Sequence, residues 1–195
     1  MGRPRAGTHE TATPERLLVA AEAEFARAGL DGTRLEDIAK RAGIRRPSLL
    51  YYFPTKEALY ARVVRRAFAR LGQALLEAMT DPGGFAESVE RTAEAFEISL
   101  RAEPALAKLI LRELLDGRGP GRAILLEEMV PLLDQVEQFV KRHGRGLARR
   151  GLPVRAAILQ GASDLVLRAA SGDLQAPLWG PGHARTLARM LFLKG

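Results

Sequence analysis

The chain has 195 residues, enough for one large domain or two small ones, and 47% of them are hydrophobic while 27% are charged, as in a globular protein. It has no cysteine, which excludes disulfides, thiolate metal sites, iron–sulfur clusters and cysteine nucleophiles. Its net charge of +7 mildly favours a polyanionic partner, and because no apolar run is long enough for a membrane span or a secretory signal, we expect a cytoplasmic protein without a membrane partner.

The first helix is predicted to begin at an N-cap on Thr13 and to stop at Gly29, because Leu17, Leu18, Ala21 and Phe25 recur at helical spacing between them. Residues 1–12 before it are expected to form a flexible polar tail. The basic residues of this tail either improve solubility or lie along a DNA groove as an arm.

Two short helices follow, separated by a tight turn at Gly43 and Ile44. Thr33 and Glu36 have the spacing of a capping box, which predicts a helix over about 35–42, and a second helix is predicted over about 46–53. Gly43 suits the turn because glycine accepts left-handed backbone angles. This arrangement is a helix-turn-helix, whose second helix enters the major groove of DNA.

The residues around this turn resemble the DNA-binding domain of the tetracycline-repressor (TetR) family of bacterial transcription factors. The family pattern runs Ile-Ala, Ala-Gly-Val, Thr-Leu-Tyr, Tyr-Phe and Ser-Lys-Glu. At the same spacing this chain has Asp37-Ile38-Ala39, Ala42-Gly43-Ile44, Ser48-Leu49-Leu50, Tyr52-Phe53 and Thr55-Lys56-Glu57. The resemblance covers residues 13–60 and implies a homodimer that binds a palindromic operator in double-stranded DNA.

Two positions depart from the family pattern and bear on which operator is bound. Arg45 stands where the family usually has a serine that caps the recognition helix, and Leu50 stands where it usually has tyrosine.

Basic side chains gather in the same region, with six basic and only two acidic residues between positions 34 and 56. Such residues would dominate affinity for DNA by releasing counterions from its phosphates. The sequence leaves two roles open for Tyr52, a contact with a DNA phosphate or packing in the core. For Phe53 we predict packing in the core. The candidate DNA-binding residues are Thr33, Arg34, Arg45, Arg46, Ser48, Tyr51, Tyr52 and Lys56.

The rest of the chain also shows helical patterns and no sustained strand alternation. A long helix is predicted over 56–79, and after a break at 80–84 further helices are predicted over 85–101, 104–116, 122–150, 153–171 and 181–193. Pro131 should kink or split one of them. We therefore expect an all-α protein of about nine helices, with a DNA-binding domain over 13–60 and a helical ligand-binding and dimerisation domain over 61–195.

Two apolar seams in this second domain suggest an interface between copies, because helix-turn-helix proteins read two half-sites. The alternative is that both seams face the core of a single chain. The candidate interface residues are Leu132, Val136, Phe139, Ile158, Gly161, Ala162 and Leu165.

A pocket for a small-molecule effector is expected among the helices between residues 85 and 150. Its candidate residues are mainly apolar, with two hydroxyls: Phe85, Thr92, Phe96, Ser99, Leu100, Leu109, Ile110, Met129 and Leu133. Nothing in the sequence identifies the effector.

Signals for an enzyme are weak. The three histidines, His9, His143 and His183, have no metal-ligand spacing, and neither a nucleophile elbow nor a phosphate-binding loop is present. We therefore expect no catalytic site, metal or cofactor, and we predict a repressor that a small molecule releases from its operator. The alternative is a helical lipid- or hydrophobe-binding protein whose basic end contacts a membrane surface.

Overall fold

A computed structural model describes residues 12–116 and 120–194, and this part of the chain is built from helices, as the sequence predicts. The expected tail over residues 1–12 lies outside the described residues except for Ala12. The elements are α1 (Ala12–Gly32), α2 (Leu35–Arg41), α3 (Arg46–Tyr52), α4 (Lys56–Thr80), α5 (Phe85–Ala102), α6 (Pro104–Asp116), α7 (Pro120–His143), α8 (Val154–Ala170), the 3₁₀ turn η1 (Gly172–Leu174), α9 (Gln175–Trp179) and α10 (Ala184–Phe192).

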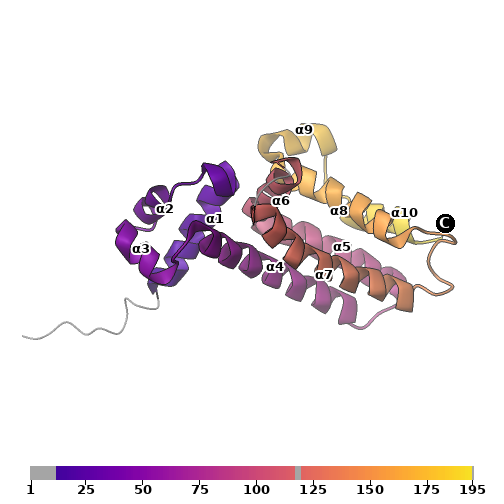
Figure 1. The fold of residues 1–195 in the computed structure, drawn as a ribbon. Coiled ribbons are helices and arrows are strands. Elements are labelled where there is room, and N and C mark those ends of the chain that lie inside the picture. Colours follow the sequence, from indigo (N-terminus) through magenta and orange to yellow (C-terminus); the bar gives the residue numbers. More distant parts are fainter. Residues whose placement is uncertain (1–11, 117–119, 195) are drawn as a thin grey trace, which may run out of the picture.

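The helices gather into two groups, which α4 connects (Figure 1). At one end α1 packs against α4, α2 packs on α1 and α3 packs on α2. At the other end α5 and α7 pack along α4, and α6, α8 and α10 pack on these two helices and on one another. The domain boundary predicted after residue 60 therefore falls inside an unbroken helix. This helix begins where the Thr55 hydroxyl accepts a hydrogen bond from the Ala58 amide, a standard N-cap.

The first helix contains the break that Gly29 predicts, although helical structure resumes after it up to Gly32. Gly29 has φ 72°, a left-handed conformation that costs other residues about 1–2 kcal/mol. A Cβ here would also lie 2.6 Å from Cδ of Arg112 on α6. Glycine thus allows both the turn of the chain and the close approach of α6.

The helix predicted over 122–150 is wrong at its C-terminal end, because α7 stops at His143. A Cβ on Gly144 would lie 2.5 Å from the carbonyl oxygen of Val140, so glycine lets the chain turn back tightly at this point. Beyond the turn, Ala148 forms an isolated antiparallel bridge with Leu193. Pro131 does not split α7, which continues through it in one piece.

The short helix α9 is absent from the sequence prediction. It precedes Gly180, which has φ 67° and returns the chain toward α10. The Trp179 indole N–H donates to the Asp164 carboxylate on α8 at 2.9 Å. Trp179 therefore fastens this segment to α8 through a polar contact as well as through packing.

The buried apolar side chains form two clusters. The larger one runs from α1, α2 and α3 along α4 into α6, with Leu17, Phe25, Leu49 and Leu59 fully buried. The smaller one, which includes Phe85, lies between α5, the end of α7, α8 and α10. The C-terminal helices thus enclose apolar space with side chains from both clusters.

Glu24 joins the first two helices electrostatically, since it accepts hydrogen bonds from Arg27 at 2.8 Å and from Arg41 on α2 at 2.8 Å. These bonds, that from Arg27 first, lower the pKa of Glu24 below its ordinary value of 4.5. Glu22 lies close by on α1, and burial raises the pKa of its carboxyl.

The two carboxylates should therefore have opposite effects on stability. The charged form of Glu24 stabilises the fold above pH 4.5, and this contribution is lost as the pH falls through its lower folded-state pKa. We expect Glu24→Gln to lower the free energy of unfolding by about 1 kcal/mol at pH 7, a modest value because both arginines are partly exposed. The difference should shrink as the pH falls below 4.5, as measured by urea unfolding.

Glu22→Gln is the matched control on the same helix. Burial disfavours the charged form of Glu22 in the folded state. The neutral carboxyl therefore stabilises the wild type at low pH, and this stabilisation should be lost as the pH rises above 4.5. The variant should accordingly match or exceed the wild type at pH 7. A loss of stability at pH 7 that is equal in both variants would contradict the assignment.

Candidate functional site

The helix-turn-helix is present as predicted, with α2 and α3 joined by residues 42–45. The Ile44 amide donates to the Ala39 carbonyl at 3.0 Å and the Gly43 amide to that of Lys40 at 3.1 Å, which closes the end of α2. Gly43 has φ 71°, and no atom lies within 4 Å of where its Cβ would be. Ile38 and Leu49 are fully buried between the helices, so the angle between α2 and α3 is fixed by packing.

The outer face of α3 is polar and exposed. Arg45, Arg46 and Ser48 are exposed there, and the Tyr51 side chain is 84% exposed. No side chain caps α3, although Arg45 holds the cap position with extended backbone angles. The open Tyr51 ring beside these exposed polar side chains is available for a partner.

Tyr52 lies at the edge of this face and is half-buried against the core, as Leu50 and Phe53 also are. Its ring meets that of Tyr51 edge to face, with centroids 5.4 Å apart. Core packing, one of the two alternatives for Tyr52, thus holds for most of its ring. Phe53 has the core position expected for it.

The capping box predicted at Thr33 is wrong. Arg34 holds the N-cap of α2 and no side chain bonds the first turn. The Thr33 hydroxyl is buried and donates to the carbonyls of Glu24 and Gly29 at 3.1 and 2.6 Å. Its side chain therefore ties α2 to α1 and is withdrawn from the set of candidate DNA contacts.

Lys56 has partners that the sequence did not suggest. Its ammonium donates to the carbonyl oxygens of Asp31 and Thr33, both at 3.2 Å, and so fixes the start of α4 to the end of α1. These carbonyl oxygens offset the ammonium charge at the N-terminal end of α4. An ammonium has three N–H groups, which leaves one for a phosphate.

Some cations of the basic region are neutralised within the protein and others are not. Arg41 pairs with Glu24, and Arg46 pairs with Glu36 at 3.0 Å between exposed side chains. Within the ranges 12–116 and 120–194, Arg34, Lys40 and Arg45 are exposed and have no ion pair. These three carry the positive charge that is free to meet a partner.

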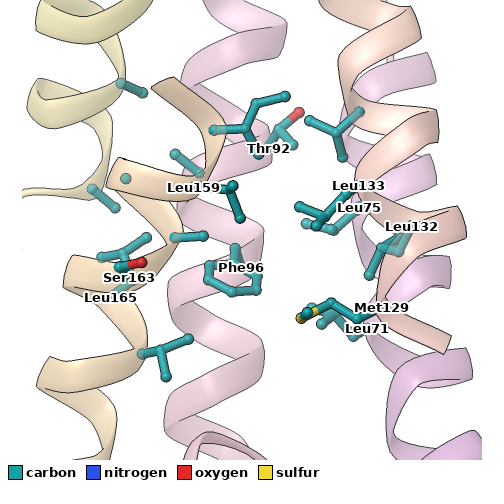
Figure 2. Close-up of a pocket in the computed structure, with 18 of the residues that line it drawn as sticks. Leu71, Leu75, Thr92, Phe96, Met129, Leu132, Leu133, Leu159, Ser163 and Leu165 are labelled. Carbon is teal, nitrogen blue, oxygen red and sulfur yellow. The ribbon is translucent and has the colours of Figure 1, made fainter. Parts of the chain in front are cut away.

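An apolar cavity of about 440 Å³ lies in the C-terminal group of helices. Figure 2 shows side chains of α4 and α7 on one side of it, α8 on the other and α5 between them. Leu71 and Leu75 come from α4, and Leu187 and Leu191 come from α10. The cavity was expected among residues 85–150, but helices that precede and follow this segment in the sequence also line it.

Five of the predicted pocket residues line this cavity, namely Thr92, Phe96, Ile110, Met129 and Leu133. The prediction is wrong for the other four. Phe85 packs against Phe139 in the smaller cluster, the Ser99 hydroxyl donates to the Ala95 carbonyl away from the cavity, and Leu100 and Leu109 are buried in the larger core.

The seven residues predicted to form a dimer interface instead line the cavity within one chain. They are Leu132, Val136, Phe139, Ile158, Gly161, Ala162 and Leu165. The small residues Gly161 and Ala162 of α8 leave space inside the protein. The alternative, in which both seams face the chain's own interior, describes their positions.

Helix α6 contacts both the DNA-binding end and the cavity. On one side the Arg112 guanidinium donates to the Arg27 carbonyl of α1 at 3.0 Å, and Glu113 accepts a 2.7 Å bond from the buried Tyr60 hydroxyl of α4. Burial, followed by the bond to Glu113, raises the pKa of Tyr60. On the other side Ile110 and Leu111 line the cavity. These polar contacts were missed because the sequence gives no pairing signal across such distances.

The comparison with protein families decides what this helix-turn-helix is. Residues 17–63 match the family model described as bacterial regulatory proteins, tetR family. Residues 17–63 therefore form a TetR-family DNA-binding domain. The regulator RutR of Escherichia coli (strain K12) is 35% identical over 119 residues, which cover 61% of this chain and 54% of that protein. The match thus spans about half the length of that relative.

Solved structures share the fold of this chain over most of its length. The fatty acid degradation regulator FadR from Bacillus halodurans has a TM-score of 0.75 at 17% identity, with 91% of this chain and 97% of that one covered. FadR from Bacillus subtilis, solved in complex with stearoyl-CoA, has a TM-score of 0.72 at 17% identity, with 91% and 95% covered. At these identities the similarity concerns the fold.

Other kinds of site find no support in the described ranges. No group of three histidine, aspartate or glutamate side chains there could hold a metal ion. His183 lies between Asp164 at 3.0 Å and Arg168 at 2.9 Å, a cluster that ties α10 to α8, and His9 lies outside the described residues. None of the described helices combines the length and hydrophobicity that spanning a bilayer requires.

The turn of this TetR-family domain can be tested at Gly43. Gly43→Ala should lower the free energy of unfolding by about 1–2 kcal/mol, because alanine is strained at φ 71° although nothing crowds its Cβ. The strain should also change the angle between α2 and α3 and weaken binding to duplex DNA, measured by fluorescence anisotropy.

Gly172 provides the matched control, since it has φ 59° and equally open space but lies beside α8. Gly172→Ala should cost similar stability and leave DNA binding unchanged. Equal loss of DNA binding in both variants would show that the effect is general destabilisation.

Proposed function

We propose that this protein is a transcriptional regulator that binds an operator in double-stranded DNA through α3 and leaves it when a small molecule fills the apolar cavity. The observation that carries the proposal is the exposed polar face of α3 in a TetR-family helix-turn-helix. The matched relatives are themselves transcriptional regulators. This role places the protein in the bacterial cytoplasm, and the alternative of a lipid carrier at a membrane gains no support.

The DNA contacts come from the exposed residues of this face. Arg45, Ser48 and Tyr51 reach the bases or the flanking phosphates. Arg46 also contacts DNA once its ion pair with Glu36 breaks. Arg34, Lys56 and the edge of Tyr52 contact the phosphate backbone on either side. Arginine in the major groove can hold a guanine edge with two hydrogen bonds, worth about 1–3 kcal/mol of discrimination.

The cavity communicates with α3 through the two helices that line it and also hold the DNA-binding end. Leu71 and Leu75 place α4 on the cavity wall, and Ile110 and Leu111 do the same for α6. A ligand that prefers another position of these helices also shifts the recognition helices. It can change operator affinity only by its differential affinity for the two arrangements, typically about 1–3 kcal/mol.

The protein acts as a homodimer whose interface includes the exposed face of α8. The exposed apolar residues of α8 and α10 are Met190 and also Leu159 and Leu167, which lie at the open side of the cavity. Leu159 and Leu167 are eight residues apart and so lie on one side of α8, with Ser163 between them. Two copies paired along this stripe would present two recognition helices for adjacent major grooves.

Selection of bound sites from random duplex DNA tests the function. We expect a twofold-symmetric consensus whose half-sites lie about one DNA turn, 34–36 Å, apart or a multiple of it. Recovery of no consensus, with affinity independent of sequence, would overturn the proposal.

Arg45→Ala is expected to weaken binding to the selected site and to reduce the salt dependence of the affinity by about one in slope, as loss of one phosphate contact does. Arg101→Ala is the matched control, because Arg101 is also exposed and has no ion pair within the described ranges, but lies at the end of α5. Its affinity and slope should equal those of the wild type. Identical behaviour of both variants would contradict the placement of the DNA face.

Leu167→Glu should convert the dimer to monomers in sedimentation experiments and lower operator affinity with it. Leu76→Glu is a close control, since both leucines are 47% exposed on long helices, α8 and α4. It should leave a dimer with unchanged affinity. A dimer that survives Leu167→Glu would place the interface elsewhere.

A further inference from the structure

The walls of the cavity are chemically uniform. Leucine, isoleucine, valine, phenylalanine, methionine and alanine make up almost all of the lining, and the only hydroxyls among the described lining residues are those of Thr92 and Ser163. None of the described lining residues carries a charge. A bound molecule would therefore meet hydrocarbon on nearly every side, as Figure 2 shows for the central part.

Charged groups of the helices around the cavity form pairs with one another instead of lining it. Glu97, next to the lining residue Phe96, lies 3.9 Å from the buried Arg168. Glu113 accepts the Tyr60 hydroxyl, and Arg155 links α8 to Asp134 on α7 at 2.6 Å. An ionised ligand group inside the cavity would meet no charged side chain among the described lining residues, and burying an unpaired charge is far more costly than burying a polar neutral group. The cavity thus selects against carboxylates and ammonium ions.

Thr92 limits the ligand further because its own proton is already used. Its hydroxyl donates to the Ser88 carbonyl one turn earlier on α5, at 2.7 Å. A hydroxyl has one donor and two acceptor lone pairs, so the Thr92 oxygen can only accept a hydrogen bond from a ligand. It matches an O–H or N–H group and offers nothing to a carbonyl or carboxylate oxygen.

Ser163 differs from Thr92 in position and freedom. It is exposed on α8 between Leu159 and Leu167, at the rim of the cavity, and its hydroxyl has no partner within the ranges 12–116 and 120–194. Because it can donate or accept, it does not discriminate between these groups. Selection by hydrogen bonding therefore falls to Thr92.

We propose that the effector of this cavity is an uncharged, mainly hydrocarbon molecule with one hydrogen-bond donor, such as a long-chain or aromatic alcohol, and that Thr92 recognises this donor. The proposal rests on the proposed function, since it names the ligand class for the same regulatory site. It assigns Thr92 as the residue that distinguishes alcohols from ketones and acids of equal length.

Displacement of the uncharged fluorophore N-phenyl-1-naphthylamine from the full-length protein tests the ligand class. Four probes share an eleven-carbon chain: 1-undecanol, 2-undecanone, undecanoate and undecylammonium, each used below its micelle concentration at pH 7.5. We expect 1-undecanol to bind at least about tenfold more tightly than either ion, and more tightly than the ketone by the two- to tenfold that about one hydrogen bond provides. Tighter binding of undecanoate or undecylammonium would overturn the proposal.

Thr92→Val tests the donor-specific contact, because valine keeps the shape of threonine without its oxygen. The variant should lose the preference for 1-undecanol over 2-undecanone while its affinity for the ketone stays the same. Ser99→Ala is the matched control, since Ser99 makes the same bond to the carbonyl four residues earlier on α5 but does not line the cavity. It should retain the preference. An unchanged preference in Thr92→Val, with thermal unfolding like that of the wild type, would remove Thr92 from the recognition of the ligand.

Operator binding separates this inference from the function on which it rests. If 1-undecanol binds with the expected preference but leaves operator affinity unchanged, the ligand class stands and the release mechanism fails. If operator affinity responds only to undecanoate or undecylammonium, the release mechanism stands and the ligand class is wrong.

Discussion

The hydrogen bond between the Tyr60 hydroxyl and the Glu113 carboxylate joins two polar groups that are both buried in a largely apolar core. Neither group could remain there alone, because an unpaired buried carboxylate is strongly destabilising. The bond therefore fixes α4 against α6 at the level where the DNA-binding end meets the cavity. Arg112, the residue before Glu113, reaches α1 from the same helix. The helices that bound the cavity are in this way the ones that position the helix-turn-helix.

The position of the cavity explains why side chains that look like a dimer seam lie inside one chain. A helix with an apolar side packs equally well against a second copy or against its own domain, since burial of hydrocarbon has no direction. Gly161 and Ala162 on α8 allow close approach in either case. Here Phe96, Leu133 and their neighbours do not fill the space in front of them, so the small residues border a void. The exposed leucines of α8, Leu159 and Leu167, lie at the open side of this void.

The sequence was sufficient for the parts of the fold that depend on local rules. Gly43 and Gly29 marked breaks that require left-handed backbone, and the periodic leucines of α4 marked the long connecting helix. It failed where a distant partner decides the outcome. The end of α7 depends on Gly144 passing close to Val140 and Phe85, and Thr33 bonds to carbonyls of α1 instead of capping α2. For the site, spacing identified the exposed residues of α3, but it could not distinguish Leu100 and Leu109 in the core from Ile110 on the cavity wall.

The exposed pair of Arg46 and Glu36 bears on how the protein would search for its operator. In the free protein the carboxylate occupies the guanidinium, which lowers the positive potential at the start of α3. Any DNA that engages Arg46 must first displace Glu36, and for an exposed pair this exchange costs no more than about 1 kcal/mol. A phosphate of non-operator DNA stabilises Arg46 little more than the ion pair with Glu36 did. A guanine edge instead accepts two directed hydrogen bonds from the guanidinium. If Arg46 contacts the operator as proposed, the pair would shorten the residence of the protein on random sequence relative to its residence on the operator.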